Sequence, residues 1–386
     1  MPINYQQALT KIRQMGAQAR QRDSILQELK QQALQLLRDK SGCEAELREL
    51  AAGAARLNPH LRAGLPAFGR LDARVSAAAG AGAQTVLLAA DGSQINPDRH
   101  AAVEFGAINV GAIRLCPGEP PRETIDSQLL FYEELYIEGV PLNEATVALR
   151  RDKEERAMLK TLAEPKVSAG RAVITLTDGP LELYGQDQNS ALYKNTLLEY
   201  LDVLRGLSRL GAGAAGYVDK PRSDYVVRLL ELVLLSQEND LSQAGRKHPL
   251  FPVRDSDLFE QLLQPGERSA VFALRSPAAE NFTADLALHF FYLNVGRTGK
   301  PHLARVEVPQ WVAADLGLLE TLQAVLLSQA QQMGPQPYPY IIHRAHEIAV
   351  VSFAEKDQLE TLIAAELRRN GVTPGEKSAK QFAKDS

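Results

Sequence analysis

The run Val86-Leu87-Leu88-Ala89-Ala90-Asp91-Gly92-Ser93-Gln94 decides how this chain is interpreted. Its first five residues are apolar and turn-forming residues follow them, which predicts a buried β-strand that ends at Asp91. An aspartate placed where a core strand meets solvent is costly unless a cation pairs with it. We therefore expect Asp91 to lie at a functional edge of a sheet.

A second strand candidate has the same form. Residues 171–177 read RAVITLT and run directly into Asp178-Gly179. Two core strands that each bring an Asp-Gly step to one edge predict a shared acidic site, and paired carboxylates are how proteins hold Mg²⁺ or Mn²⁺. Asp-Gly is also a common turn signal, so either step taken alone is better explained as a turn.

The composition is that of an ordinary globular protein, with 386 residues of which 45% are hydrophobic and 23% charged. No apolar stretch approaches the roughly 18 residues of a membrane span, and the polar N-terminus lacks the apolar core of a signal peptide. Cys43 and Cys116 are too few for a disulfide framework or a cysteine zinc site. We expect a cytoplasmic protein with no membrane partner.

The net charge of −4 conceals an uneven distribution. Residues 1–80 carry 12 Lys/Arg against 7 Asp/Glu, and the remainder carries 31 against 40. A basic arm on an acidic body suits local contact with a polyanion or an acidic partner, although a solvated helical face explains the charge equally well.

Periodicity predicts the order of the elements. Residues 5–56 read as one or two amphipathic helices, which Pro59, Gly64 and Pro66 separate from the body. Further strands are predicted at 103–115, 212–218, 270–274, 286–295 and 304–308, and helices at 143–163, 190–209, 224–237, 256–263, 311–333, late in 337–352 and at 355–369. Strands followed by alternating helices and strands favour an α/β fold with a mixed sheet, in which sites form beyond the carboxyl ends of strands.

The predicted helix 143–163 offers a third carboxylate. Ala148, Glu155, Leu159 and Leu162 form its core-facing stripe, so Glu155 lies on an apolar face. Glu154, about 100° round the helix, is the alternative. A surface helix with i,i+4 ion pairs explains these charges as well.

A late segment, 338–347, reads YPYIIHRAHE and contains two histidines three residues apart. His346 is a candidate metal ligand or proton carrier, and Tyr338 is a candidate for orienting a phosphate or a water. A lone histidine is more often structural, but here His343 and His346 lie on one side of a predicted helix.

These residues follow the order in which ribonuclease-H-like nucleases present their metal ligands: strand Asp, helix Glu, strand Asp, late-helix carboxylate or His. The chain resembles the NurA family of DNA-end-processing nucleases from about residue 84 to about residue 353. The matching segments are LLAADGSQ (87–94), EFGAINVGAIRL (104–115), ALRRDKEERA (148–157), VITLTDGPL (173–181), GYVDKPRSDYVVRLL (216–230), LFEQLLQPGERSAVF (258–272), HFFYLNVG (289–296), ARVEVPQWVA (304–313) and YPYIIHRAHEIAVVS (338–352).

The resemblance implies a ribonuclease-H-like fold and assigns roles to the residues already singled out. Catalytic and metal-ligand roles go to Asp91, Glu155, Asp178 and His346, with Tyr338 beside them and Glu154 as the alternate carboxylate. Lys220 and Arg222 match a basic spot that could meet the DNA backbone. The expected domains are a helical arm (1–70), a nuclease domain (71–370) and a disordered tail (371–386).

By the same resemblance, the chain is a deoxyribonuclease that uses Mn²⁺ or Mg²⁺, with two ions per site, and acts on DNA as a homodimer beside a HerA-type hexameric ATPase. Expected activities are 5′–3′ exonuclease and single-strand endonuclease, in DNA end processing, repair or phage defence. An acidic protein holds DNA poorly by itself, so a partner that delivers the strand is expected. The alternative is a non-catalytic nucleic-acid-binding or scaffold subunit on the same fold.

Overall fold

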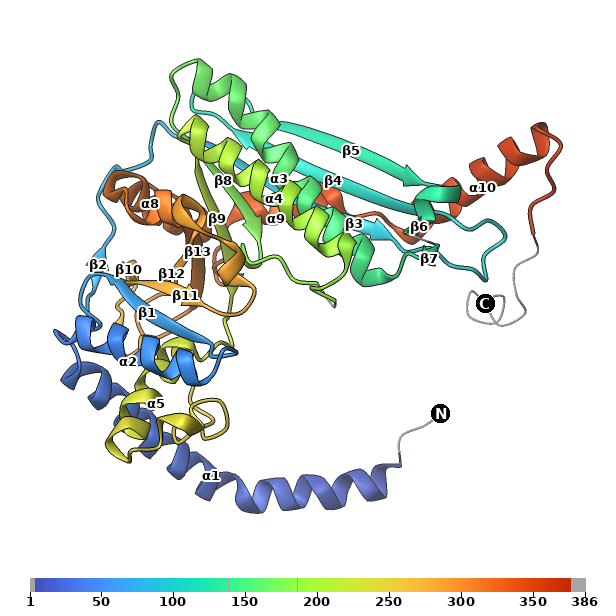
Figure 1. Ribbon diagram of the computed structural model, residues 1–386. Helices are drawn as coiled ribbons and strands as arrows, with labels where there is room; N and C mark the ends of the chain where they lie inside the picture. The colour runs from blue at the N-terminus through green and yellow to red at the C-terminus, as the bar shows by residue number, and fades with distance from the viewer. Residues whose placement is uncertain (1–3, 138, 186, 376–386) are drawn as a thin grey trace. The chain divides into compact units, whose positions relative to one another are not determined.

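The computed structural model describes residues 4–137, 139–185 and 187–375 (Figure 1). The chain divides into two compact units. Unit 1 comprises Met1–Ala77, Asp219–Asn281 and His289–Arg305, and unit 2 comprises Ala78–Val218, Phe282–Leu288 and Val306–Ser386. The helical arm therefore shares a unit with two later segments of the chain. The functional domain boundaries given above stay a prediction, and residues 376–386 of the expected tail lie outside the described residues.

Unit 1 combines helices with short antiparallel strands. In chain order its elements are α1 (Tyr5–Asp39), α2 (Glu44–Leu57), β1 (Ala63–Phe68), β2 (Val75–Ser76), α5 (Tyr225–Gln237), η2 (Leu241–Gln243), α6 (Asp255–Leu262), β10 (Glu267–Arg268), β11 (Val271–Arg275), η3 (Ala279–Asn281), nearly all of β12 (Leu288–Asn294) and the start of β13 (Leu303–Pro309).

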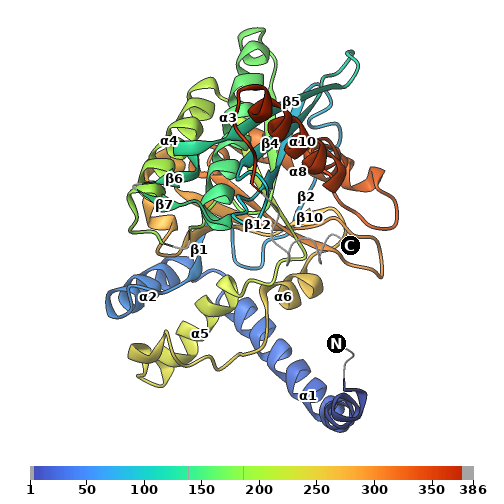
Figure 2. The same cartoon turned by 90° about the vertical axis from the view of Figure 1, so that its right-hand side faces the viewer.

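The long helix α1 confirms the expected amphipathic arm. Asn4 caps it by accepting a hydrogen bond from the backbone N–H of Gln7, and Ala33, Leu34 and Leu37 are buried near its C-terminal end. Its N-terminal half extends beyond α2 and α5 (Figure 2). Only the C-terminal third of α1 is therefore stabilised by packing within unit 1.

The segment that forms β1 was expected to be a break between the helical arm and the body of the protein. Instead it pairs with β11, which pairs in turn with β12, and Gly64 and Pro66 lie inside it. A Cβ at Gly64 would stand 2.6 Å from the ring of Phe290, so glycine is required for the close approach. Proline is tolerated because β1 is an edge strand of unit 1, where fewer backbone N–H groups need a partner.

Unit 2 holds a mixed sheet with helices on both faces. Its elements are β3 (Val86–Ile95), β4 (Gly106–Leu115), β5 (Arg122–Leu130), η1 (Tyr132–Leu135), β6 (Tyr136–Ile137), β7 (Val140–Pro141), α3 (Glu144–Ser168), β8 (Val173–Asp178), α4 (Ala191–Leu210), β9 (Gly213–Asp219) up to Val218, η4 (Ala284–Leu286), the end of β13, α7 (Gln310–Ala313), α8 (Leu316–Gln332), α9 (Tyr340–Ala349) and α10 (Phe353–Arg369).

The strand order in this unit is β9-β8-β3-β4-β5. The strands β3, β4 and β5 form an antiparallel meander, and β8 and β9 add in parallel beside β3. Helix α3 packs on β3 with α4 beside it, and α9 packs on β3 and β4 (Figure 1). This topology confirms the α/β, ribonuclease-H-like mixed sheet that the sequence predicts.

Two glycines set how closely helices approach β3 and β4. A Cβ at Gly92 would lie 2.7 Å from the Glu155 carboxylate of α3, and a Cβ at Gly111 would lie 2.5 Å from the backbone N of Ala349 in α9. Because neighbouring residues of a strand face opposite sides, and Gly111 pairs with the residue before Gly92, the two helices cover opposite faces of the sheet. Both depend on the missing side chains.

Three expectations about elements are corrected. β3 does not end at Asp91 but continues to Ile95, because Gly92, Ser93 and Gln94 pair with β4. The expected helix 311–333 is divided, since Asp315 caps a new helix by accepting from the N–H of Leu318. β5 was not expected.

Candidate active site

Strands β3 and β8 bring two of the expected acids to one level of the sheet. Their parallel pairing ends at Ala90 and Thr177, so Asp91 and Asp178 are the next residue on each strand. Asp178 ends β8, and Gly179 turns the chain with a φ of 79° that glycine adopts without strain. Asp91 lies inside β3 but at the point where its β8 neighbour stops. The prediction that the two Asp-Gly steps meet is therefore supported by the pairing.

Helix α3 carries the third acid to the same place. Its N-cap, Asn143, accepts a hydrogen bond from the N–H of Thr146, as the predicted helix start requires. Glu155 is 7% exposed and its carboxylate lies against Gly92 of β3. The helical phase that placed Glu155 on the core side is thus the one observed.

A cavity of about 240 Å³ in unit 2 is lined by all three acids. Asp152 and Glu182 add two more carboxylates, and Arg151 and Arg156 add two guanidinium groups. The remaining lining residues are Thr177, Gly179, Pro180, Leu183, Tyr184 and Tyr200. The cavity is therefore acidic, with five carboxylates against two arginines.

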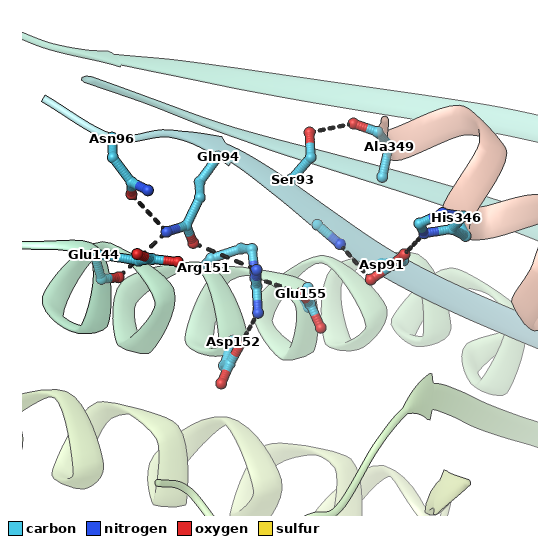
Figure 3. Close-up of polar contacts among 11 residues, drawn as sticks. Asp91, Ser93, Gln94, Asn96, Glu144, Arg151, Asp152, Glu155, His346 and Ala349 are labelled. Atoms are coloured by element: carbon cyan, nitrogen blue, oxygen red, sulfur yellow. Dashed lines mark hydrogen bonds and ion pairs between the residues drawn. The ribbon is translucent and has the colours of Figure 1, made fainter. Parts of the chain in front are cut away.

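The segment around α9 reaches the two strand aspartates. The ring N–H at His346 Nδ1 donates to Asp91 Oδ2 at 2.7 Å (Figure 3), and the Tyr338 hydroxyl donates to Asp178 Oδ1 at 2.9 Å. Tyr338 lies just before the helix, whose N-cap is Pro339. Burial and the neighbouring Asp178 both raise the pKa of Tyr338, so it remains a donor.

Burial dominates the electrostatics of Glu155. Burial, together with the negative charges of Asp152 and Asp91, raises the pKa of this carboxyl to about 8 against the opposing effect of Arg151. Burial likewise raises the pKa of Asp152, against the effect of Arg151. Acids that are crowded and desolvated in this way favour a bound cation, which reverses the local charge.

The other predicted residues lie elsewhere. Glu154 is ion-paired with Lys153 at 2.6 Å and is outside the residues that line the cavity. His343 pairs with Glu347 one turn along α9, at 3.6 Å, rather than with Asp91. Lys220 and Arg222 are exposed and belong to unit 1, just after β9.

Sequence reasoning missed several residues of the cavity. Asp152 is three residues before Glu155, so the helical spacing that selected Glu155 also selects it. Glu182 follows Asp178 by four residues, is 3% exposed and accepts from the Tyr184 hydroxyl at 2.5 Å. Nothing in an irregular segment such as 179–185 indicates which side chains turn inward.

The donor set suits a hard divalent cation. Carboxylate oxygens, the His346 imidazole and the Thr177 hydroxyl, which is buried and lacks a hydrogen-bond partner among the described residues, are ligands or water-holding groups for Mg²⁺ or Mn²⁺. Within residues 4–137, 139–185 and 187–375, however, no three acidic, histidine or cysteine side chains already form a group that could hold a metal ion. Instead, Asp91 and Asp178 are hydrogen-bonded to His346 and Tyr338, and Glu155 is ion-paired with Arg151.

The mixed sheet, with an acidic cavity where the parallel pairing of two strands ends, places the protein in the ribonuclease-H-like fold class. The NurA domain matches residues 85–351, about two thirds of the sequence. The chain belongs to the NurA family, which is a family of nucleases.

Solved structures with detectable similarity include the NurA nuclease of Sulfolobus solfataricus, at 13% identity and a TM-score of 0.48, over 84% of this chain and 94% of that one. The catalytic domain of human Endonuclease V aligns at 13% identity and a TM-score of 0.32, over 83% and 98%. Endonuclease V of Ciona intestinalis in complex with DNA aligns at 12% identity and a TM-score of 0.30, over 72% and 87%. No curated protein sequence matches.

Among the described residues, none of the helices has both the length and the apolar character that crossing a membrane requires.

Proposed function

We propose that this chain is a divalent-metal-dependent deoxyribonuclease whose site consists of Asp91, Glu155, Asp178, His346 and Tyr338. The observation that carries the proposal is that the three acids, from β3, α3 and β8, line one cavity. His346 and Tyr338 are each hydrogen-bonded to one of them. If these acids were ordinary turn residues, we would not expect them to line the same cavity.

Each residue has a chemical task in this proposal. Two divalent ions, Mn²⁺ or Mg²⁺, would activate water and stabilise the leaving oxygen of a phosphodiester. Asp91, Glu155 and Asp178 would hold them through carboxylate oxygens. Tyr338 fixes the orientation of Asp178. His346 donates from Nδ1 to Asp91, which leaves Nε2 to bind a cation or to carry a proton.

The finer parts of the proposal concern substrate and partners. We propose 5′–3′ exonuclease and single-strand endonuclease activity on DNA, by a cytoplasmic homodimer working with a HerA-type hexameric ATPase in end processing, repair or phage defence. Lys220 and Arg222, both exposed, are proposed contacts for the DNA backbone. A formal net charge of −4 supports dependence on a partner that delivers the strand.

Cleavage of linear and single-stranded DNA by the full chain tests the proposal. Cleavage should require Mn²⁺ or Mg²⁺ and stop with EDTA. Asp91→Asn and Asp178→Asn should each lower the cleavage rate by more than about 100-fold. Mutation of a residue that only hydrogen-bonds to a metal ligand already lowers activity by about 10–100-fold. The melting temperature without metal should stay level or rise, because carboxylate repulsion is relieved.

Asp98→Asn is the matched control, because Asp98 lies in the loop between β3 and β4, outside the cavity. Full activity in either site variant would remove that residue from the site. DNA binding without cleavage in the unmodified protein, whatever the metal, would favour the non-catalytic binding or scaffold subunit.

A further inference from the structure

Arg151 of α3 lies among the acids of the cavity and contacts three of its neighbours (Figure 3). Its Nη2 is 2.9 Å from Asp152 Oδ1, its Nη1 is 3.3 Å from Gln94 Oε1, and its Nε is 3.3 Å from Glu155 Oε1. A single guanidinium group therefore faces a strand amide and two helix carboxylates.

These contacts are not equivalent. Arg151 donates true hydrogen bonds to Asp152 and to Gln94. Its Nε is buried and has no hydrogen-bond partner among the described residues, so its contact with Glu155 is an ion pair without a hydrogen bond. Charge-assisted hydrogen bonds are the stronger kind. The Nη atoms of Arg151 are thus held by hydrogen bonds to Asp152 and Gln94, whereas Glu155 is held by the weaker ion pair alone.

The path of the arginine is fixed by β3. A Cβ at Gly92 would lie 2.5 Å from Cγ and 2.8 Å from Cδ of Arg151, so the aliphatic part of this side chain crosses the strand where no side chain stands. Gln94, two residues along the same face of β3, then receives its tip. The glycine and the amide together direct Arg151 toward Glu155.

The charge of the cavity favours a cation at the position of Arg151. Its five acids and two arginines have a formal net charge of −3 when all are ionised. The second arginine, Arg156, directs Nη1 to the carbonyl oxygen of Ala215 at 3.5 Å. Arg151 is the arginine that lies within ion-pair distance of the helix acids.

We propose that Arg151 is the resident counter-cation of Glu155, which a divalent cation must replace, so that Arg151 sets the cation concentration at which the site loads. This inference rests on the proposed function, because it takes Glu155 as a metal ligand. On loading, the Glu155 carboxylate turns from Arg151 Nε to the cation, and Asp152 and Gln94 keep the guanidinium in place. No covalent bond changes.

The test is a titration of the full chain with Mn²⁺ in the absence of DNA. Electron paramagnetic resonance measures the concentration of free Mn²⁺ at each step. Arg151→Gln removes a positive charge beside the ligand, so its Kd for Mn²⁺ should fall by at least about fivefold. Arg150→Gln is the control, because it removes the same charge from the preceding position of α3. Arg150 is not one of the described residues lining the cavity. The Kd of this variant for Mn²⁺ should therefore stay within about twofold of the original.

A second measurement is the melting temperature. In EDTA, Arg151→Gln should have a lower melting temperature than the unmodified protein, because the acids lose their counter-ion. Addition of Mn²⁺ should raise the melting temperature of Arg151→Gln by more than it raises that of the unmodified protein. Arg151→Lys keeps the charge without the planar fork and should bind Mn²⁺ within about twofold of the original. If Arg151→Gln does not fold, the Kd of Arg151→Lys for Mn²⁺ tests the proposal in its place.

An unchanged or higher Kd in Arg151→Gln, or a Kd raised tenfold in Arg151→Lys, would overturn the proposal, since Arg151 would then orient Glu155 for the cation instead of competing with it. Failure of the proposed function has a different result. In that case the unmodified protein itself binds no Mn²⁺ and cleaves no DNA.

Discussion

Glu155 is a carboxylate packed between a helix and a strand, with almost no contact with water. It reaches this position because Gly92 leaves space above its oxygen. Glu154, its neighbour along α3, is turned toward Lys153, which also pairs with Glu199 on α4 at 3.1 Å. Adjacent acids of one helix therefore have different surroundings, and only one of them faces the cavity.

We expect Glu155→Gln to lower the rate of metal-dependent DNA cleavage by more than about 100-fold, as the loss of a metal ligand should. Glu154→Gln should change it little, because it removes a surface ion pair. Initial rates at saturating Mn²⁺ measure both. The opposite ranking would mean that α3 turns by one position when metal binds.

His346 and His343 offer a second matched pair on α9. His346→Ala should lower the cleavage rate by about 100-fold, the scale of a lost proton-transfer group. His343 pairs only with a residue of its own helix in the described contacts, so His343→Ala should have little effect. The pH dependence of the rate provides the further check, because only the His346 variant should change its shape. Small and equal losses would indicate that both histidines are structural.

At the scale of elements, α5 of unit 1 carries a buried acid that has no part in the proposed chemistry. Glu231 accepts from the N–H of Leu250 at 3.0 Å and lies 3.3 Å from both Arg228 and His248. Burial raises its pKa to about 7, although the Leu250 N–H and Arg228 lower it. Folding therefore favours the protonated form of this group.

The sign of the pH effect follows from linkage. Between the unfolded pKa of 4.5 and the folded pKa of about 7, the folded state holds a proton that the unfolded state has released, so stability falls as pH rises. Relative to Glu231→Gln, the unmodified protein should lose unfolding free energy across this window and then level off. Urea unfolding at pH 4.5, 6 and 8 measures the difference. A difference that does not change with pH would show that Glu231 is ionised in the folded protein throughout.

The elements predicted from sequence were those whose burial follows a simple period. β3, β8 and β9 are apolar runs. The predicted helix starts at residues 143 and 190 agree with the structure, where Asn143 and Ser190 are the N-caps of α3 and α4. β5 was missed because its residues are mostly exposed, so that no apolar alternation identifies it. β1 was missed because proline and glycine were taken as breaks, which holds for central strands and not for an edge.

The site was predictable in part for the same reason. The carboxyl ends of parallel strands meet at one edge, which places Asp91 and Asp178 together, and helical phase places Glu155. Glu182 comes from an irregular segment, and the direction of Arg151 depends on a glycine on another element. Neither follows from periodicity.

At the scale of the whole molecule, the basic arm exposes several large apolar side chains to solvent. Ile12 and Met15 of α1 are 58% and 68% exposed, and Tyr5, Leu9 and Ile25 are also exposed. α2 by contrast is buried against β1 and α5. We propose residues 4–28 of α1 and its N-cap as a docking element, because removal of α2 would damage unit 1 itself.

Ile12→Glu with Met15→Glu should abolish homodimerisation, or stimulation by a HerA-type ATPase, if α1 is the docking element. Gln7→Glu with Gln14→Glu adds the same charge to exposed polar positions of α1 and should change neither. Light scattering gives the mass, and DNA cleavage with and without the ATPase gives the stimulation. If the first pair of changes leaves both intact, the contact lies on the body of the protein.

The two glycines on β3 and β4 also limit how this protein can be redesigned. At position 92 an added methyl group would meet side-chain atoms of Arg151 and Glu155, which would have to leave the positions described above. At position 111 it would meet the backbone of Ile348 and Ala349, which cannot move without displacing α9 and with it His346. A library that varies the acids to seek new metal or substrate preferences should therefore keep Gly111 unchanged, and should vary Gly92 only together with Arg151 and Glu155.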